Sequence, residues 1–312
     1  MQALSYPRFG GPEVLELHDV APPTITADEV LVRVKATGLN PLEWKFREGK
    51  MTLMSGKKFP QVVGTEFSGV VVDAGARVRA FAAGDEVFGF VDRKRGGSFQ
   101  ELVAVRPALI ARKPADVSFE EAATICVVGT AAWMALVEKA EVRAGQSILI
   151  NGCTGGLGIW ATQMANRRGL DVTGVTSTDG LATARQLGCH HVIDYQTASV
   201  FDDGRAYDVV LDAADVLSFG QAKKLLKSGG AFLNPTPTPA QIVGAFLGNL
   251  LPGKKHHVIL GAPDEERIRH LAEEASEIEL LVHETFPLSQ APAAYAYAEG
   301  NSFVGKVVVT VG

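Results

Sequence analysis

Short runs that alternate hydrophobic and polar residues dominate the first 120 positions. The clearest runs are EVLVRVKATGLN (29–40), VVGTEFSGVVVDAG (62–75), DEVFGFV (85–91) and FQELVAV (99–105), and Gly, Pro and Asp separate them. A period of two is typical of strands with one buried face, and frequent turn residues indicate that the strands are short. The pattern predicts a mostly antiparallel, barrel-like β domain over residues 1–120.

The pattern changes after Pro114. Ser118 is followed by Glu121, the spacing of a capping box, and an apolar helix is expected to continue through residues 118–140. Further on, short apolar runs alternate with helical segments. The runs are SILIN (147–151), DVTGVT (171–176), HHVID (190–194), YDVVLDA (207–213), GGAFLN (229–234) and HHVILG (256–261). This alternation favours parallel strands with right-handed crossovers, so residues 121–261 are predicted to form a doubly wound sheet.

The pattern of the last fifty residues predicts that they belong to the first domain. Residues 263–280 place apolar side chains on one helical face, with Pro263 near the first turn. A short helix in AAYAYAEG and a terminal strand in GKVVVTV follow, so residues 262–312 are expected to complete the β domain. NPTPTPAQ (234–241) is predicted to be a loop.

Composition and charge narrow the class of protein. The chain has 312 residues, of which 46% are hydrophobic and 21% charged, and these shares are typical of globular domains. The formal charge of −5 and the lack of long basic runs disfavour nucleic-acid or anionic-membrane partners. Neither a secretory signal nor an apolar stretch of ~18 residues is evident. We therefore expect a cytoplasmic protein.

The three cysteines, Cys126, Cys153 and Cys189, are widely spaced and form no C-x-x-C pair. Their number and spacing exclude a disulfide framework or a cysteine-rich structural zinc site.

A glycine-rich loop, NGCTGGLG (151–158), follows the strand SILIN and precedes an apolar helix expected to begin near Leu157. Backbone N–H groups at a helix N-terminus bind a diphosphate well, and the missing side chains at Gly155 and Gly156 let it approach. Gly158 is expected to let the helix pack closely. The alternative is a turn that serves packing only. Cys153 stands at the first glycine position of G-x-G-x-x-G and is interpreted as a small space-filling residue, not a nucleophile.

The end of the second predicted strand indicates which nucleotide is held. Thr176, Ser177 and Thr178 are neutral there, whereas an NAD site usually has an acid that would repel a 2′-phosphate. Asp179 complicates this interpretation, because it either caps the next helix or reaches the ribose. We predict a preference for NADP.

Taken together, these motifs resemble the zinc-free quinone oxidoreductase branch of the medium-chain dehydrogenase/reductase superfamily. The resemblance rests on GLNPLEWKFREGK (38–50), residues 62–90, GGSFQELVAV (96–105), SFEEAAT and GTAAW (118–133), the glycine loop, LGCHHVIDY (187–195) and the terminal GKVVV. It implies an α/β protein with a GroES-like β-rich catalytic domain and a doubly wound Rossmann domain.

The sequence departs from the zinc-dependent relatives at two ligand positions. Asn40 stands where they have a cysteine, and Thr65 stands where they have the histidine of Gly-His-Glu. With no substitute cluster and no four-cysteine lobe, no metal is predicted. The histidine pairs 190–191 and 256–257 are adjacent in predicted strands, so their side chains point to opposite faces and are interpreted as polar strand starts.

The resemblance also implies the cofactor, NADPH, and its binding residues. These are Asn40, Thr130, Gly155, Gly156, Leu157, Thr176, Ser177, Thr178, Tyr195, Asn234, Gly261 and Lys306. Tyr195 is alternatively a half-exposed loop aromatic. Asn40, Thr65 and Thr130 are the candidates for orienting the acceptor.

The predicted reaction is hydride transfer from NADPH to a quinone or an α,β-unsaturated carbonyl compound without zinc. The alternatives are a zinc-independent aldehyde or ketone reductase and a non-catalytic NADP-binding sensor or structural protein. A small-molecule substrate is expected. The strand VILG is predicted to lie at the sheet edge and to pair with a second subunit, so a homodimer is expected.

Overall fold

The computed structural model describes residues 1–92, 95–261 and 264–312, with the side chains of residues 53 and 54 outside that description. Two compact units make up the chain. The first comprises Met1–Val127, Pro263–Ser302 and Lys306–Gly312, and the second comprises Val128–Ala262 and Phe303–Gly305. The predicted α/β fold class, a GroES-like β-rich domain with a Rossmann domain, is confirmed.

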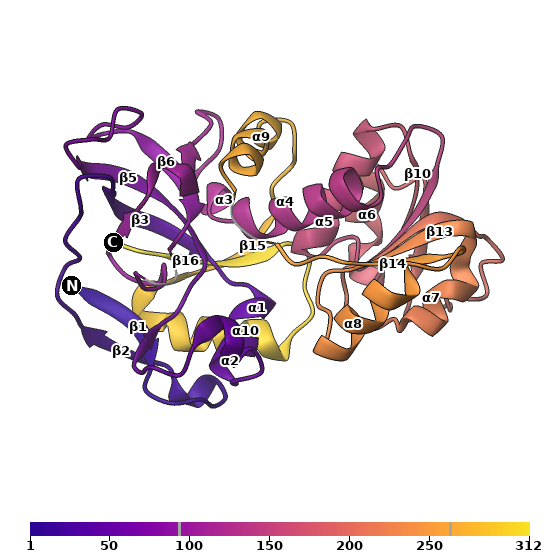
Figure 1. Ribbon diagram of the computed structural model, residues 1–312, viewed down its shortest axis with the longest axis horizontal. Helices are drawn as coiled ribbons and strands as arrows, with labels where there is room; N and C mark the ends of the chain where they lie inside the picture. Colours follow the sequence, from indigo (N-terminus) through magenta and orange to yellow (C-terminus); the bar gives the residue numbers. More distant parts are fainter. Residues whose placement is uncertain (93–94, 262–263) are drawn as a thin grey trace. The chain divides into compact units, whose positions relative to one another are not determined.

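The first unit is built on a mixed sheet in the order β15-β16-β3-β5-β6-β8, with β7 also paired to β3 (Figure 1). Its strands are β3 (Val30–Gly38), β5 (Glu66–Ala74), β6 (Glu86–Phe90), β7 (Leu102–Val105), β8 (Ile110–Arg112), β15 (Val282–Pro287) and β16 (Lys306–Thr310). A smaller sheet contains β2 (Glu16–Asp19), β1 (Gln2–Tyr6) and β4 (Gln61–Val62). Because β16 pairs antiparallel with β3, the two ends of the chain share one sheet.

The alternation in β3 explains how this sheet forms. Val30, Val32 and Val34 are fully buried, whereas Arg33 between them is exposed. The helices of the unit are α1 (Pro41–Arg47), α2 (Thr52–Ser55), α3 (Phe119–Ala122), α9 (Glu265–Ala275) and α10 (Ala291–Gly300). Tyr295 of α10 is fully buried, so this short helix is part of the core.

The second unit holds a parallel sheet in the order β11-β10-β9-β12-β13-β14. Its strands are β9 (Ser147–Asn151), β10 (Asp171–Thr176), β11 (His191–Asp194), β12 (Tyr207–Asp212), β13 (Leu226–Asn234) and β14 (Lys255–Val258). The strand order reverses between β9 and β12, which is where doubly wound sheets bind ligands.

Helices cover both faces of this sheet. In Figure 1, α5 (Gly156–Arg167) and α6 (Leu181–Gln186) lie on one face, and α7 (Phe219–Leu225) and α8 (Pro239–Gly248) lie on the other. Right-handed crossovers produce this division because the chain winds outward from the centre in opposite directions. No helix among the described residues is long and apolar enough to cross a membrane.

The helix predicted after Ser118 is divided. The capping box is present, since Glu121 N donates to Ser118 Oγ at 3.2 Å, but α3 ends at Ala122. The Thr124 hydroxyl donates to the carbonyl of Glu121, and a new helix, α4 (Cys126–Trp133), follows with a π-helical segment over Met134–Lys139. The prediction of one continuous helix is wrong because the apolar run continues across the break.

Two predicted boundaries near the end of the chain are also wrong. Helix α9 begins at Glu265, where the Asp264 side chain accepts from two backbone N–H groups, and it ends at Ala275 instead of residue 280. Ile278 is buried although it lies beyond the end of the helix. Its place in the apolar pattern therefore suggested a longer helix. The position of Pro263 lies outside the described residues.

The predicted loop over residues 234–241 contains the start of α8. Thr238 caps this helix with a capping box to Gln241, and Pro239 occupies its first turn. The threonine and proline residues that suggested a loop are therefore helix-start signals.

The last strand is shifted towards the N-terminus from its predicted position. Strand β14 is Lys255–Val258, so residues 259–261 of the predicted VILG strand lie outside it. His256 is 4% exposed and stacks on Phe219, with ring centroids 4.7 Å apart. His256 and His257 lie within β14, as interpreted, but His256 packs into the core.

Candidate functional site

The glycine loop joins β9 to α5, with Gly155 as the N-cap of the helix. A Cβ added at Gly155 would meet its nearest atom at 3.6 Å, so the space beside this backbone is open. A Cβ at Gly158 would lie 2.0 Å from the carbonyl oxygen of Gly152, so this glycine is required for close packing. Gly152 has φ +81°, a conformation that glycine adopts readily.

Hydrogen bonds fasten the loop to the strands beside it. The N–H groups of Gly152 and Cys153 both donate to the carbonyl oxygen of Val175. The hydroxyls of Thr154 and Thr176 are 2.6 Å apart, and both side chains are buried. The structure therefore places the predicted nucleotide residue Thr176 against the loop itself, where it holds Thr154 in position.

Two polar residues that the sequence analysis missed lie at the ends of neighbouring strands. Asn151 of β9 donates to Asp212 of β12 at 2.8 Å. The other Asp212 oxygen accepts from the backbone N–H groups of Val216 and Leu217. Burial raises the pKa of the Asp212 carboxyl above its usual range. The sequence did contain a signal for these two residues. Both end strands that flank the point where the strand order reverses.

The hydroxyl cluster after β10 is only partly available to a ligand. The Thr178 hydroxyl is 2.6 Å from an Asp194 oxygen and 2.7 Å from Gln196 Oε1, both of which accept. Ser177 is half-buried. Asp179 is exposed in the next turn, and Tyr195 is 54% exposed.

Thr130, Asn234 and Gly261 also belong to the second unit. Thr130 on α4 is 1% exposed, and within the described part of the chain its hydroxyl oxygen has no partner. A Cβ at Gly261 would lie 3.8 Å from the Thr130 methyl group, so these two residues are neighbours. Asn234 ends β13 and accepts from the Thr236 N–H, which fixes the turn before α8.

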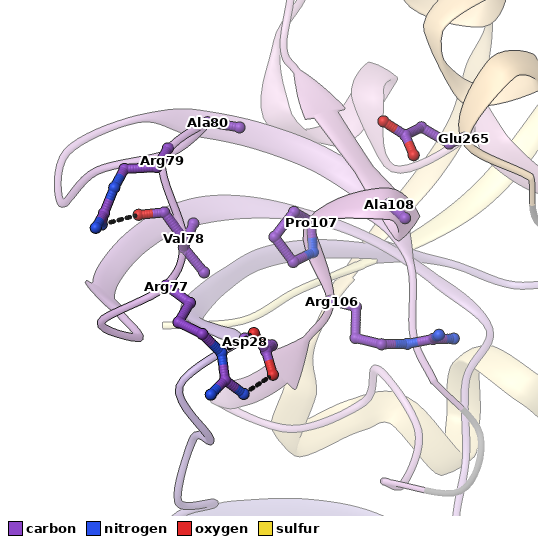
Figure 2. A pocket seen from close by; sticks show the side chains of 9 residues that line it. All are labelled: Asp28, Arg77, Val78, Arg79, Ala80, Arg106, Pro107, Ala108 and Glu265. Atoms are coloured by element: carbon purple, nitrogen blue, oxygen red, sulfur yellow. Dashed lines mark hydrogen bonds and ion pairs between the residues drawn. The ribbon is translucent and has the colours of Figure 1, made fainter.

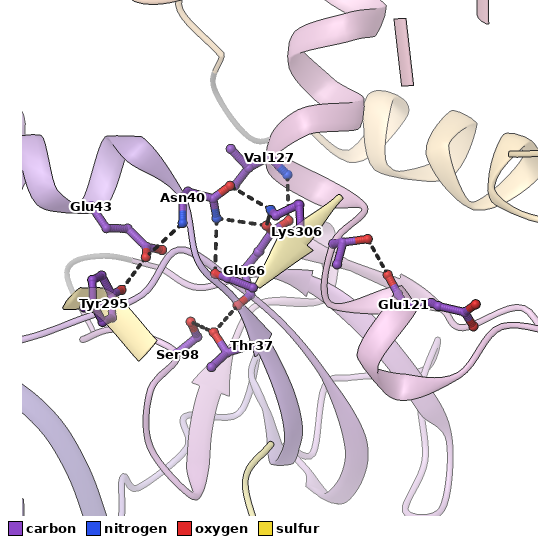
Figure 3. A network of polar contacts seen from close by, with 11 residues as sticks. Thr37, Asn40, Glu43, Glu66, Ser98, Glu121, Val127, Tyr295 and Lys306 are labelled. Atoms are coloured by element: carbon purple, nitrogen blue, oxygen red, sulfur yellow. Dashed lines mark hydrogen bonds and ion pairs between the residues drawn. The ribbon is translucent and has the colours of Figure 1, made fainter. Parts of the chain in front are cut away.

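A buried polar network occupies the first unit (Figure 3). Glu66, at the start of β5, accepts from Lys306 Nζ at 2.5 Å and from Asn40 Nδ2 at 2.9 Å. Its second oxygen accepts from the Val127 N–H at 2.8 Å. The side chains of Glu66 and Lys306 are 1% and 7% exposed, so this ion pair is almost completely removed from water.

Asn40 is held by partners on both sides of its amide. Its oxygen accepts from Lys306 at 2.8 Å, and its nitrogen donates to Glu66 and to the carbonyl oxygen of Gly38. By contrast, the buried Thr65 hydroxyl has no partner in the described structure. The sequence analysis assigned Asn40 and Lys306 to cofactor binding, and the structure brings them together on Glu66.

A second carboxyl, Glu43 of α1, lies beside this network. Its Oε2 accepts from the Tyr295 hydroxyl at 2.5 Å and from the Asn40 N–H, while Oε1 has no partner among the described residues. Burial raises the pKa of Glu43 to about 7, and the nearby Glu66 charge also raises it. Burial and Glu43 raise the pKa of Tyr295 as well. The sequence analysis missed this pair because the two residues are far apart in the chain.

A separate hollow of about 430 Å³ lies in the first unit (Figure 2). It is lined by Asp28, Arg77, Val78, Arg79, Ala80, Arg106, Pro107, Ala108 and Glu265. Arg77 pairs with Asp28, and Arg79 donates to the carbonyl oxygens of Ala76 and Val78. Since these groups are already engaged and none is a predicted site residue, we do not assign the cofactor to this hollow.

The fold, the glycine loop of the second unit and the buried polar network of the first unit indicate a dehydrogenase. It is built from a GroES-like domain and a nucleotide-binding domain. The alcohol dehydrogenase GroES-like domain matches residues 26–115, and the zinc-binding dehydrogenase family matches residues 187–309. As predicted, the chain belongs to the quinone oxidoreductase family of medium-chain dehydrogenases/reductases, and it is an oxidoreductase.

Three relatives illustrate this membership. The chain is 33% identical to the NADPH-dependent alkenal/one oxidoreductase of Arabidopsis thaliana, over 99% of this chain and 79% of that protein. It is 29% identical to the chloroplastic quinone-oxidoreductase homolog of Spinacia oleracea, over 99% and 98%. The solved quinone oxidoreductase of Coxiella burnetii is similar with a TM-score of 0.89 and 28% identity, over 100% and 99%.

Proposed function

We propose that this protein uses NADPH to reduce quinones or α,β-unsaturated carbonyl compounds, without zinc. The observation that carries the proposal is the open glycine cradle at Gly155, together with neutral residues in place of an acid directly after β10. The relative from Arabidopsis, which is named for NADPH and for alkenals, supports the choice of cofactor and acceptor.

The residues of the second unit fit a dinucleotide. The first N–H groups of α5, at Gly156 and Leu157, are available to a diphosphate because a helix leaves them without partners. Ser177 offers a hydroxyl to a 2′-phosphate. The unpartnered hydroxyl of Thr130 is a buried group that a bound nicotinamide would satisfy. When bound, NADPH supplies the hydride.

The donor set of the first unit does not suit zinc. Asn40 and Thr65 supply an amide and a hydroxyl, and the one carboxylate between them, Glu66, is neutralised by Lys306. Zinc sites in proteins use thiolate, imidazole or carboxylate ligands. No group of three or more His, Cys, Asp or Glu side chains arranged for a metal ion occurs within the described residues.

The chain's own residues then orient the acceptor and stabilise charge. We assign to the Thr65 hydroxyl the role of donating to the carbonyl oxygen on which negative charge develops. Lys306 and Glu66 act as positioning residues, because they fix the Asn40 amide. Proton delivery to the product is assigned to water.

Acceptor profiling with the purified protein tests the proposal. NADPH oxidation is followed with a benzoquinone, a naphthoquinone, an alkenal and a saturated aldehyde, and we expect turnover with the conjugated acceptors. Turnover with the saturated aldehyde alone would favour the aldehyde reductase alternative. NADPH binding without turnover of any acceptor would favour the non-catalytic one.

A fluorescence titration tests the cofactor preference separately. We expect tighter binding of NADPH than of NADH. Replacing Ser177 by Asp is expected to reverse that preference, because a carboxylate repels a 2′-phosphate and binds ribose hydroxyls. Tighter NADH binding by the unchanged protein would overturn this part of the proposal.

We also propose that the protein is a homodimer. The edge strand β14 is followed by Leu260, and the preceding helix α8 presents an exposed apolar face. The exposed side chains are Val243, Phe246 and Leu247 of α8, and Leu250 and Leu251 directly after it. An apolar face beside an unpaired strand edge is suited to a second copy of the same chain, because two edge strands related by a two-fold axis pair antiparallel.

A further inference from the structure

Two cysteines meet beneath the glycine loop, and the proposed reaction uses neither. Cys153 belongs to the loop and is 0% exposed, whereas Cys189, between α6 and β11, is 7% exposed. Each of these two thiols shifts the pKa of the other. Both are free thiols, as is Cys126, which lies in the other unit beside Glu66.

Gly174 of β10 explains how the two sulfurs come together. A Cβ added to this glycine would lie 2.5 Å from the Cys189 sulfur and 2.6 Å from the Cys153 sulfur. The two sulfurs therefore share the space over one backbone position in the middle of the sheet. Any larger residue at position 174 would push them apart.

The two thiols differ in their chemistry. The neighbouring Cys153 lowers the pKa of Cys189, although burial acts in the opposite direction. The same contact with Cys189, together with burial, raises the pKa of Cys153. Since the thiolate is the reactive form, Cys189 is the nucleophile, and its residual exposure lets a small oxidant reach it first.

We propose that Cys153 and Cys189 form a reversible disulfide when the protein meets a hydroperoxide. The Cys189 thiolate attacks the peroxide, forming an S–O bond and breaking the O–O bond, so that an alcohol or water leaves after protonation. Cys153 loses its proton and attacks the sulfenic sulfur, and a water molecule leaves. Two thiols are oxidised by two electrons, and one hydroperoxide is reduced.

The disulfide would tie the glycine loop to the start of β11. An S–S bond of about 2.05 Å is much shorter than the contact between two unbonded sulfur atoms, so Cys153 must move towards Cys189. This consequence rests on the proposed function, because it concerns NADPH bound at the loop. We expect about tenfold weaker NADPH binding after oxidation, within the usual range of coupling between sites.

Thermodynamic linkage makes the effect reciprocal. Saturating NADPH should favour the dithiol by the same tenfold factor, which corresponds to about 30 mV in the reduction potential of a two-electron couple. NADPH should therefore protect the two thiols from oxidation.

Thiol counting and peptide mapping test the disulfide without any cofactor. After treatment with hydrogen peroxide and removal of the excess, the denatured protein should show one thiol instead of three, and dithiothreitol should restore the others. Mass mapping should find the Cys153 and Cys189 peptides joined and Cys126 reduced. Cys126→Ser should fall from two thiols to none, and Cys153→Ser should form no such link and should accumulate a Cys189 sulfenic acid that dimedone traps.

The outcomes separate this inference from the proposed function. Three intact thiols after excess peroxide, or a disulfide that joins two chains, would overturn the pairing. A correct disulfide with unchanged NADPH affinity would overturn the coupling to the loop. If the reduced protein fails to bind NADPH at all, the proposed function fails, while the mapping result still decides whether the cysteines pair.

Discussion

Glu66 and Lys306 carry opposite charges in a site that excludes water, with side chains 1% and 7% exposed. Removing one member of such a pair leaves an uncompensated buried charge. We expect Lys306→Met to lower the free energy of unfolding in urea by about 3–5 kcal/mol. The double variant with Glu66→Gln should recover part of this loss, because it removes the stranded carboxylate.

Lys227 provides the matched control. It pairs with Asp208 at 2.8 Å, but its side chain is 46% exposed, so water already screens the charge. Lys227→Met should cost less than about 1 kcal/mol. Equal losses for the two lysine variants would contradict a special role for the buried pair.

The raised pKa of Glu43 predicts how the stability of the protein depends on pH. Its pKa is raised from 4.5 to about 7 in the folded protein, so the folded state binds more protons than the unfolded state between these values. The stability that the protonated carboxyl contributes is present below pH 4.5 and is lost as pH rises through 7. Tyr295, Glu66 and Lys306 are the other ionisable groups that act on it.

Glu43→Gln should remove that dependence. Because the amide does not ionise, the difference in unfolding free energy between pH 4.5 and pH 8 should shrink by on the order of 3 kcal/mol relative to the unchanged protein. Urea unfolding across this range measures it. A variant whose pH profile parallels that of the unchanged protein would show that Glu43 titrates normally.

At the scale of elements, two glycines of the β9–α5 turn have different roles: Gly155 is expected to serve NADPH binding, and Gly158 serves helix packing. Gly155 has φ −80° and open space at its Cβ position, so Gly155→Ala should fold with little loss of stability. Its methyl group would nonetheless occupy the place predicted for the diphosphate, and NADPH should bind about tenfold more weakly or worse.

Gly158→Ala is the paired variant. Its Cβ would lie 2.0 Å from the Gly152 carbonyl oxygen and 2.6 Å from Cys153 Cα, and backbone atoms cannot move aside cheaply. We expect a loss of stability in the range of overpacked cores, about 1–3 kcal/mol or more. Thermal unfolding and NADPH titration of both variants measure the contrast. If Gly155→Ala binds NADPH normally, the loop does not hold the diphosphate.

The elements themselves were largely predictable where local pattern determines them. The strands SILIN and DVTGVT match β9 and β10 at every residue, because β-branched and apolar side chains fill these short buried segments. Boundaries were wrong where the apolar pattern continued past the end of the element, as at Ile278. The start of α8 was missed because threonine and proline are common both in loops and in helix caps.

At the scale of the whole molecule, the contacts within the polar networks could not be predicted from the sequence. Asn40 and Lys306 were each predicted as site residues, but their contact depends on β16 pairing with β3 across most of the chain. Glu43 and Tyr295 meet in the same way. Local patterns predict which face of an element is buried, whereas which buried polar groups become partners depends on tertiary pairing. The cytoplasmic location stays a prediction.

The proposed homodimer gives the last test. Phe246 and Leu250 are 71% and 72% exposed and lie four positions apart, so they share one face of α8 and the turn that follows. The unchanged protein should sediment at twice the chain mass of 33.1 kDa. Replacing both residues by Glu should yield a folded monomer, because carboxylates on this face would be buried without partners.

Phe201→Glu, at a 41% exposed site elsewhere in the same unit, should remain dimeric. A 33.1 kDa species at micromolar concentration in the unchanged protein would contradict the proposal, and a dimer that survives the double substitution would place the interface elsewhere.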